Sequence, residues 1–290
     1  MTRYLVTGAS GELGQLAVAE LAQLVGPAAI VALVRSDAAA TAYAAQGIAT
    51  RRGDYDDRAS LEAAFAGVDR LLFISSSAIG SRLVQHANVV AAAQGAGVGF
   101  IAYTSLLGPA ARAMRIGAEH VATEAMLADS GIPHTLLRNG WYIENVLMGL
   151  PQALAAGQIY GSSGEGRFSP ATRADYAAAA AVVLNGGHDG AVLELGGDEA
   201  FTMGEFAATL SQLSGRTIGF VSIPEAALAA VMVQAGLPAT VAEVLADADA
   251  RAARDLLFAP AGGLSGLLGR PTTSYATVLR AALADVAAVT

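Results

Sequence analysis

The sequence predicts an α/β fold in which a doubly wound parallel sheet is followed by a smaller, discontinuous C-terminal α/β lobe. Short apolar runs alternate with Ala-rich helical stretches through the first half of the 290 residues. The runs are nearly continuous, as expected for parallel strands that helices cover on both faces. After Asn139 the alternation loosens and turn residues become frequent, which indicates a separate lobe.

Six strands and five helices are expected in the first half, because short runs of branched aliphatic residues bounded by turn residues are typical of strands. The expected strands are 3–8, 29–35, 48–54, 70–77, 100–106 and 134–140. The expected helices between them are 13–25, 37–47, 60–67, 81–97 and 117–131.

The second half of the sequence predicts one further strand and several helices, which are joined by turns. We expect the first domain to cover 1–139, with 173–186 packing back on it, and the smaller, substrate-binding lobe to cover 140–290. The expected helices are 171–184, 202–215, 224–236, 239–257 and 274–286, and the expected strand is 191–197.

Composition excludes several kinds of chemistry. All seventeen basic residues are Arg, and the chain contains neither Lys nor Cys. Schiff-base catalysis, a phosphate-loop NTPase, a disulfide framework and a thiolate site are therefore excluded. A formal net charge of -8 argues against a nucleic-acid partner. No metal is expected, because His86, His134 and His188 lack the spacing of ligands.

The chain is expected to be cytoplasmic and to have no membrane partner. No uninterrupted apolar run approaches the roughly 20 residues of a membrane span. The sequence starts directly with an expected strand, so no secretory signal is expected.

The segment LVTGASGELG, residues 5–14, predicts a dinucleotide site. Gly8, Gly11 and Gly14 have the spacing G-x-x-G-x-x-G, directly after an apolar strand and at the start of a helix. Glycine lets the backbone approach a pyrophosphate, and the helix N-terminus adds amide donors and positive potential. A merely structural Gly-rich turn is the alternative, but the start of a βαβ unit is the context that indicates a Rossmann-like domain.

The second expected strand ends in Arg35, which favours NADPH (NADP) as the cofactor. A domain selective for NAD usually places an acidic residue there, whereas Arg suits the 2′-phosphate of NADPH. The alternative is a solvated Arg at a strand end. Asp54, after the third strand, is expected either to accept a hydrogen bond from the adenine amine or to be an exposed turn residue.

Small residues follow the fourth expected strand. They fit the close passage of a dinucleotide along the edge of the sheet, and they suit an ordinary helix cap equally well. These residues are Ser75, Ser76, Ser77, Ala78, Ile79 and Gly80.

Several segments together resemble the NmrA-like atypical short-chain dehydrogenases, and within that family the bacterial NADPH:quinone reductases. They are TGASGELG, IVALVRS, GDYDD, LLFISSS, FIAYTSLL, ATEAMLADSGIPHTLLRNGWYIENV and ATRADYAAAA. The resemblance covers nearly the whole chain and implies an acceptor beside the nicotinamide. The NADPH contacts implied are Thr7, Gly8, Ala9, Ser10, Gly11, Glu12 and Leu13, then Arg35 and Ser75 to Gly80, then Leu137, Arg138, Asn139, Gly140, Trp141, Tyr142 and Arg173.

The usual acid of short-chain dehydrogenases is missing. In that superfamily a Lys follows the catalytic Tyr by four positions, whereas Leu107 follows Tyr103 here. The chain also has Ala125 where reductases similar to it often carry Lys. Hydride addition to a quinone yields a delocalised hydroquinone anion, with a pKa near that of phenol, about 10. A quinone therefore needs no strongly poised acid, unlike an isolated ketone.

Three residues are candidates for catalytic contacts, namely Tyr103, His120 and Tyr142. Tyr103 is either a wall of the site or a packed strand residue, and His120 is either a proton donor or a surface or capping residue. Trp141 either stacks on a ligand or packs the lobe. Arg173 either reaches the cofactor or joins the lobes through an ion pair.

The leading hypothesis is an NADPH-dependent reductase that transfers hydride to quinones or similar electron-poor conjugated acceptors. A reductase of triphenylmethane dyes is an alternative, since a carbocation needs no proton either. A non-catalytic NADP(H)-sensing regulator also suits the missing acid, although the similarity to reductases weighs against it. The expected partner is a small quinone-like substrate, and a homodimer is expected from the family.

Overall fold

The computed structural model describes residues 1–289, which form two compact units. Unit 1 comprises Met1–Leu106, Glu119–Asn139 and Arg173–Glu194. Unit 2 comprises Leu107–Ala118, Gly140–Thr172 and the described residues from Leu195 onward.

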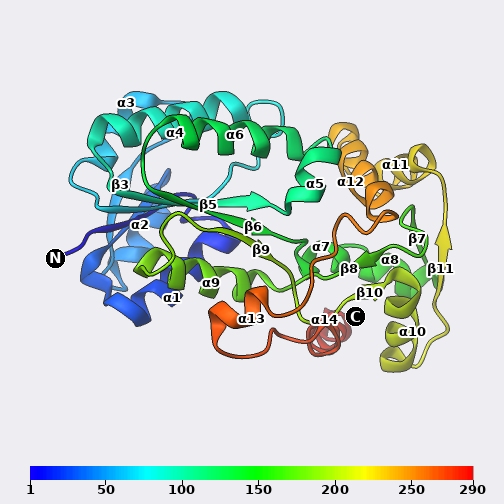
Figure 1. The fold of residues 1–290 in the computed structure, drawn as a ribbon. Helices are drawn as coiled ribbons and strands as arrows, with labels where there is room; N and C mark the ends of the chain where they lie inside the picture. Colours follow the sequence, from blue (N-terminus) through cyan, green and yellow to red (C-terminus); the bar gives the residue numbers. More distant parts are fainter. Residues whose placement is uncertain (290) are drawn as a thin grey trace. The chain divides into compact units, whose positions relative to one another are not determined.

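Unit 1 is built on a seven-stranded sheet with the strand order β3-β2-β1-β4-β5-β6-β9 (Figure 1). The chain builds outward from β1 to β3 and then returns to the other side of β1 at β4. The carboxyl ends of β1 and β4 therefore flank the switch point at which ligands bind in such sheets. The strands are β1 (Tyr4–Val6), β2 (Ile30–Val34), β3 (Ala49–Arg52), β4 (Arg70–Phe73), β5 (Phe100–Leu106), β6 (His134–Asn139) and β9 (Val192–Leu195).

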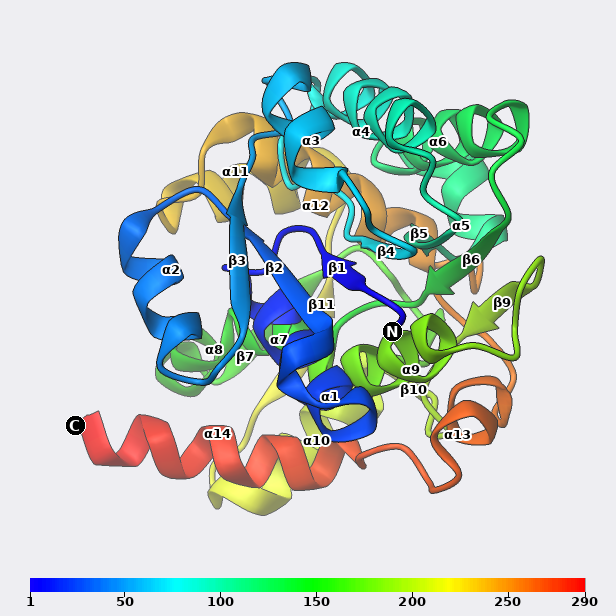
Figure 2. The same ribbon diagram turned by 90° about the vertical axis from the view of Figure 1, so that its left-hand side faces the viewer.

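Helices cover both faces of this sheet, which confirms the doubly wound α/β prediction. Helices α3, α4 and α6 lie on one face, and α1 and α9 pack together on the other (Figure 2). The helices of unit 1 are α1 (Glu12–Val25), α2 (Asp37–Ala44), α3 (Arg58–Phe65), α4 (Arg82–Ala96), α6 (Gly117–Asp129) and α9 (Arg173–Asn185), with a short 3-10 turn at Pro27–Ala29.

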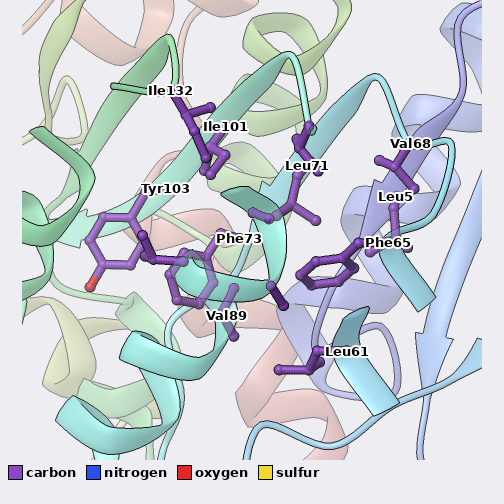
Figure 3. Close-up of a cluster of buried hydrophobic side chains, with 14 of the residues drawn as sticks. Leu5, Leu61, Phe65, Val68, Leu71, Phe73, Val89, Ile101, Tyr103 and Ile132 are labelled. Atoms are coloured by element: carbon purple, nitrogen blue, oxygen red, sulfur yellow. The ribbon is translucent and has the colours of Figure 1, made fainter. Parts of the chain in front are cut away.

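The main core lies between the sheet and helices α3, α4 and α6. Phe65 of α3, Phe73 of β4 and Tyr103 of β5 are fully buried there, with Val89 of α4 against them (Figure 3). The rings of Phe73 and Tyr103 have centroids 5.0 Å apart. The strands thus bury apolar side chains on this face, as their nearly continuous apolar runs predict.

Strand β9 differs from its expected place in the smaller lobe, because it forms the edge of the main sheet beside β6. The N–H of Leu136 donates to the carbonyl of Ala191, and the N–H of Gly140 donates to the carbonyl of Leu195. Residue numbers rise together along both strands, so the pair is parallel. Helix α9 likewise belongs to unit 1, where 173–186 was expected to pack.

Unit 2 consists mainly of helices with two small sheets, in which β7 pairs with β11 in parallel and β8 with β10 in antiparallel fashion. The strands are β7 (Gln158–Gly161), β8 (Arg167–Phe168), β10 (Phe201–Thr202) and β11 (Gly219–Ser222). The helices are α5 (Gly108–Ala113), α7 (Ile143–Leu147), α8 (Leu150–Ala156), α10 (Met203–Ser214), α11 (Glu225–Gln234), α12 (Ala239–Ala252), α13 (Gly263–Leu268) and α14 (Tyr275–Val289).

Helix α12 ends at Ala252, five residues before the end expected from its apolar pattern. The chain turns there, and Asp255 has a φ of 57° in the left-handed region. A helix cannot continue through a residue in that conformation.

Within residues 1–289, no helix combines the length and apolarity that a membrane crossing requires.

Candidate functional site

The glycine-rich turn between β1 and α1 brings the backbone into close contact with itself. Gly8 has a φ of 59°, in the region that favours glycine. A Cβ at Gly14 would lie 2.2 Å from the carbonyl oxygen of Gly8. The N–H of Gly11 donates to that same carbonyl over 2.9 Å. The turn is therefore tightly closed, and at the exposed Gly8 and Gly11 it presents backbone without a side chain, as a closely bound pyrophosphate requires.

Helix α1 begins directly after this turn, and no side chain caps its first turn. Its uncapped N–H groups and the positive end of the helix dipole make a site for an anion. The exposed residues of the segment are Gly8, Ser10, Gly11 and Glu12, and the buried ones are Thr7, Ala9, Leu13 and Gly14.

Two side chains outside the turn hold its carbonyl groups. The Tyr43 hydroxyl, from α2, donates to the carbonyl of Ala9 over 2.6 Å. Burial raises the pKa of the Tyr43 hydroxyl, so it stays a donor. Gln15 Nε2 donates to the carbonyl of Ser10 over 2.8 Å. The conformation of the turn is thus supported from α2 and from α1.

Thr7 and Tyr55 tie the ends of β1 and β4 together. The N–H of Ile74 donates to Thr7 Oγ1 over 3.0 Å, and Thr7 Oγ1 donates to the carbonyl of Leu72 over 3.1 Å. The Tyr55 hydroxyl donates to the carbonyl of Ile74 over 2.8 Å and lies 2.5 Å from Thr7 Oγ1. Burial raises the pKa of the Tyr55 phenol. The two strand ends that flank the switch point are therefore held in a fixed spacing.

Arg35 extends from the end of β2 into solvent, with 78% of its side chain exposed. Its Nη1 lies 3.9 Å from Oδ2 of Asp54, which follows β3. Asp54 Oδ1 accepts a hydrogen bond from the N–H of Asp56 over 3.1 Å, which fits the turn residue that was one of its two expected readings. The exposed guanidinium is available to a phosphate group at this edge of the sheet.

The loop of residues 75–80, after β4, is fixed by buried side chains. The N–H of Ser75 donates to Thr104 Oγ1 over 2.8 Å, and the N–H of Ser76 donates to His86 Nε2 over 2.9 Å. The N–H of Ala78 donates to Ser76 Oγ over 3.1 Å. The backbone of the loop is therefore held in place, and the Ser75 and Ser76 hydroxyls also bond to Thr104 and Gln85.

Arg82, the first residue of α4, links this loop to α6. Only 4% of its surface is exposed. Its Nε donates to the carbonyl of Ser76 over 2.6 Å, and its Nη1 lies 3.4 Å from Glu119 Oε2. Glu119 Oε1 in turn accepts the N–H of Gly80 over 3.2 Å. One buried ion pair thus holds both ends of the 76–80 loop.

The hydrogen bonds of His86 fix its tautomer. Thr123 Oγ1 donates to the carbonyl of Glu119 over 2.7 Å, so it accepts from His86 Nδ1 over 2.8 Å. Nε2 is then the acceptor for the Ser76 N–H, and the ring is neutral. Burial, and then the nearby Arg82 charge, lower the pKa of His86 to about 3.

Tyr103 and His120 contact each other inside the core. The Tyr103 hydroxyl lies 2.8 Å from His120 Nδ1, and their exposed fractions are 0% and 6%. Burial lowers the pKa of His120 to about 3 and raises that of Tyr103. The neutral imidazole and the neutral phenol therefore share one hydrogen bond. This burial favours the packed-strand reading of Tyr103 and places His120 away from the surface.

We predict that the protein loses stability as the pH falls below the ordinary pKa of histidine, because His86 and His120 are buried in the neutral form. Both folded-state pKa values lie below the unfolded value of 6.5. The unfolded chain thus binds more protons, and their contribution is complete above about pH 6.5 and is lost toward pH 3. Between about pH 7.5 and about pH 5 the free energy of unfolding should fall by about 2 kcal/mol for each histidine. Urea titrations across this range test it, and a constant free energy would contradict it.

Arg138 of β6 is held in a network of carboxylates. Its Nη2 lies 2.6 Å from Glu124 Oε2, and its Nη1 lies 2.8 Å from Glu194 Oε1. Ser105 Oγ donates to Glu124 Oε1 over 2.6 Å. These carboxylates raise the pKa of Arg138. The guanidinium ties β6 to α6 and β9.

Asn139, the last residue of β6, is 4% exposed, and its Oδ1 is a buried atom to which no described residue donates a hydrogen bond. Leu137, two residues earlier, is fully buried. A buried acceptor of this kind requires a donor from water or from a ligand. Asn139 thus offers a buried acceptor at the end of this strand.

Arg173, the first residue of α9, forms an ion pair with Glu12, the first residue of α1. The distance from Nε to Oε2 is 3.1 Å. Both residues belong to unit 1, so this ion pair lies within one unit. Arg173 therefore reaches the residue that follows the glycine turn.

Gly140, Trp141 and Tyr142 belong to unit 2. Their segment pairs with Ala171: the Ala171 N–H donates to the carbonyl of Trp141 over 3.2 Å. The N–H of Ile143 donates back to the carbonyl of Ala171 over 3.0 Å. Trp141 and Tyr142 are both half-buried.

Several residues that position the site were not predicted from the sequence. Tyr55 lies in the quoted GDYDD segment but had no assigned role. Arg82 stands at the start of a helix, where a cation is unfavourable, and this was a signal of a special contact. The residues missed include Gln15, Tyr43, Tyr55, Arg82, Thr104, Glu119 and Thr123. Among residues 1–289, no three His, Asp or Glu side chains gather where they would hold a metal ion.

The chain is similar to characterised reductases over nearly its full length. It is 49% identical to quinone oxidoreductase 2 of Escherichia coli, over 93% of this chain and 95% of that protein. It is 29% identical to the NAD(P)H azoreductase of Xenophilus azovorans, over 96% of each chain.

Solved structures show the same fold. The NADPH complex of an NADPH-dependent quinone oxidoreductase from Escherichia coli matches with a TM-score of 0.93 and 48% identity, over 95% of this chain and 98% of that one. The NADP(H) complex of Citrobacter triphenylmethane reductase matches with a TM-score of 0.91 and 34% identity, over 96% and 99%. Residues 2–253 match the NmrA-like family. The chain therefore belongs to the NmrA-like family.

Proposed function

We propose that this chain is an NADPH-dependent reductase that transfers hydride to quinones or similar electron-poor conjugated acceptors. The observation that carries the proposal is the tightly closed glycine turn, where a Cβ at Gly14 would lie 2.2 Å from the Gly8 carbonyl oxygen. This turn lies at the switch point of the sheet, which is where a dinucleotide binds. The 49% identity to an Escherichia coli quinone oxidoreductase supports quinones as acceptors.

The residues present fit NADPH. We assign the pyrophosphate to the glycine turn and the first N–H groups of α1, and the 2′-phosphate to the exposed Arg35. The loop of residues 75–80 supports the remainder of the cofactor, and Asn139 offers a buried acceptor to it. The proposed cofactor residues are Thr7 to Leu13, Arg35, Asp54, Ser75 to Gly80, Leu137 to Tyr142 and Arg173.

The cofactor supplies the hydride, and the chain supplies binding and orientation. Protonation of the reduced quinone needs little help, because its anion is delocalised and has a pKa of about 10. Tyr103 and His120 bond each other in the core, so we do not assign the proton to them. Tyr142 is half-buried and remains the proposed aromatic contact or donor. Solvent completes the protonation, so that one quinone, one hydride from the cofactor and one proton yield the hydroquinone.

An acceptor panel tests the proposal. The pure protein is mixed with NADPH and with benzoquinones, naphthoquinones, triphenylmethane dyes, azo dyes or simple ketones, and the absorbance of the reduced nicotinamide is followed. We expect the highest kcat/KM with quinones and no turnover of ketones. Faster reduction of the cationic dyes would favour the dye-reductase alternative. Tight NADPH binding without oxidation by any acceptor would instead favour a sensor.

Replacing Arg35 with Glu tests the 2′-phosphate assignment. A charge-assisted hydrogen bond is worth about 1.5–3 kcal/mol, so we expect NADPH to bind at least about tenfold more weakly. NADH, which lacks the phosphate, should change by far less. Calorimetric titration with both cofactors measures the two constants, and Arg58→Glu on α3 is the matched control. Equal losses for NADPH and NADH would show that Arg35 does not contact the phosphate.

A cytoplasmic location and a homodimer are part of the proposal. The similar full-length reductases support a small-molecule substrate. Size-exclusion chromatography with light scattering tests the dimer, and fractionation of the producing cells tests the location.

A further inference from the structure

Unit 2 contains a partly open cavity with a volume of about 380 Å³. Side chains from α8, β7, α10, α11 and α12 form its walls, together with Trp141 from the segment that follows β6. Its volume falls within the roughly 300–1,000 Å³ of pockets that bind small molecules. A single six-membered ring would leave most of that space empty.

The lining of the cavity is mainly apolar, and Asn145, Gln152 and Gln158 are its uncharged amide residues. It includes Phe206, Leu228 and the flexible thioethers of Met148, Met203 and Met232. Apolar cavities of this kind stay dry and bind apolar molecules, and methionine adapts to chains of different shape. The walls therefore select a hydrocarbon group rather than a polar one.

Asp249 carries the one charge among the described lining residues. Its Oδ2 accepts a hydrogen bond from the N–H of Ser162, and the N–H of Ser163 also bonds its carboxylate. Burial raises the pKa of Asp249. The carboxylate thus holds the loop after β7 by accepting hydrogen bonds from two backbone N–H groups of that loop.

Helix α11 forms a thin outer wall. Its sequence EAALAAVMVQ is nearly all apolar, yet Leu228 is its one buried residue. Val231 and Val233 are 37% and 44% exposed, and Val231 also lines the cavity. One apolar helix therefore lies between part of the cavity and the solvent, and its side chains offer a hydrocarbon chain apolar contacts.

Trp141 connects this cavity to the end of the main sheet through the chain itself. It lines the cavity and follows Asn139, the last residue of β6, by two positions. A ligand whose ring lies against Trp141 would thus also lie against the cavity that Trp141 lines.

We infer that this cavity binds the hydrocarbon tail of a quinone, so that the preferred acceptor is a quinone with a long apolar side chain. The inference rests on the proposed function for the quinone ring and on the cavity for the tail. Each methylene that leaves water is worth about a fourfold gain in affinity. Even partial burial of a tail should lower KM at least about tenfold.

Trp141 is the chain's single Trp, so its fluorescence reports on the cavity without any redox reaction. We would titrate the full-length protein with 1-decanol and follow the Trp141 emission. We expect a saturable blue shift. It should be lost in Ala153→Phe and Met232→Phe, which fill the cavity, and retained in Ala155→Phe, an exposed position on the same helix as Ala153. Circular dichroism identifies any variant that fails to fold. If one of the two filling variants fails to fold, the other one tests whether decanol binds in the cavity.

The kinetic arm compares methyl-p-benzoquinone with decyl-p-benzoquinone. The wild type should have at least about tenfold lower KM for the decyl compound, and the filling variants should lose this preference while they still reduce the methyl compound. Reduction of both quinones with equal KM, and no saturable response to decanol, would overturn the tail site and leave the proposed function intact. Saturable decanol binding without reduction of either quinone would leave the cavity as an apolar site but overturn its quinone ligand together with the proposed function.

Discussion

Replacing Gly14 with Ala should reduce NADPH affinity by at least about a hundredfold, the largest effect that we expect from a single methyl group. The new Cβ would lie 2.2 Å from the Gly8 carbonyl oxygen and 2.8 Å from the Cα of Ala9. Both atoms belong to the backbone of the turn, so neither can rotate away. The turn must open, and two or three hydrogen bonds to the phosphates, each worth about 1.5–3 kcal/mol when charged, are lost.

Gly95→Ala is the matched control. Gly95 lies in α4, where a Cβ would meet no atom within 4 Å. An Ala in a helix interior is more favourable than Gly by about 0.5–1 kcal/mol, so this variant should be slightly more stable and should bind NADPH normally. Equilibrium dialysis with NADPH measures both variants. Normal binding by Gly14→Ala would show that the turn is not the pyrophosphate site.

Replacing Arg82 with Met should destabilise the protein by about 3–5 kcal/mol, because it leaves a partner of a buried ion pair uncompensated. Arg82 is 4% exposed and its Nη1 lies 3.4 Å from Glu119 Oε2. The substitution also removes the 2.6 Å bond from Nε to the carbonyl of Ser76. The 75–80 loop should loosen, so NADPH affinity falls together with stability.

Two comparisons separate this buried pair from an ordinary one. Arg58→Met removes the exposed pair with Glu62, at 2.8 Å on α3, and should cost less than about 1 kcal/mol. The double variant Arg82→Met with Glu119→Gln should recover part of the loss, because no buried charge remains. Guanidinium unfolding measures all of them. Similar losses for Arg82→Met and Arg58→Met would contradict the argument.

The sheet and its helices were predictable because their signals are local. Each apolar run such as residues 100–106 forms a buried strand by its own composition, and the glycine spacing at residues 8–14 opens a helix in the expected place. Strand β9 was harder, because its neighbour in the sheet depends on contacts far along the chain. The run at 191–197 is compatible with either unit.

The supports of the site could not be predicted for the same reason. The Tyr43 hydroxyl reaches Ala9 across 34 residues, and Tyr55 reaches Thr7 across 48. No short motif encodes such pairings. The burial of Tyr103 against His120 likewise depends on how α6 packs on β5, so the sequence alone left both the packed and the catalytic readings open.

The central claim is that a nicotinamide cofactor held at the glycine turn passes hydride to a quinone. Single-turnover oxidation of the NADPH complex by excess quinone tests it most directly, with protium and then deuterium at the transferred position. We predict complete oxidation of the bound NADPH, slowed by deuterium, and loss of the reaction in Gly14→Ala. Bound NADPH that stays reduced in the presence of every quinone would contradict the claim.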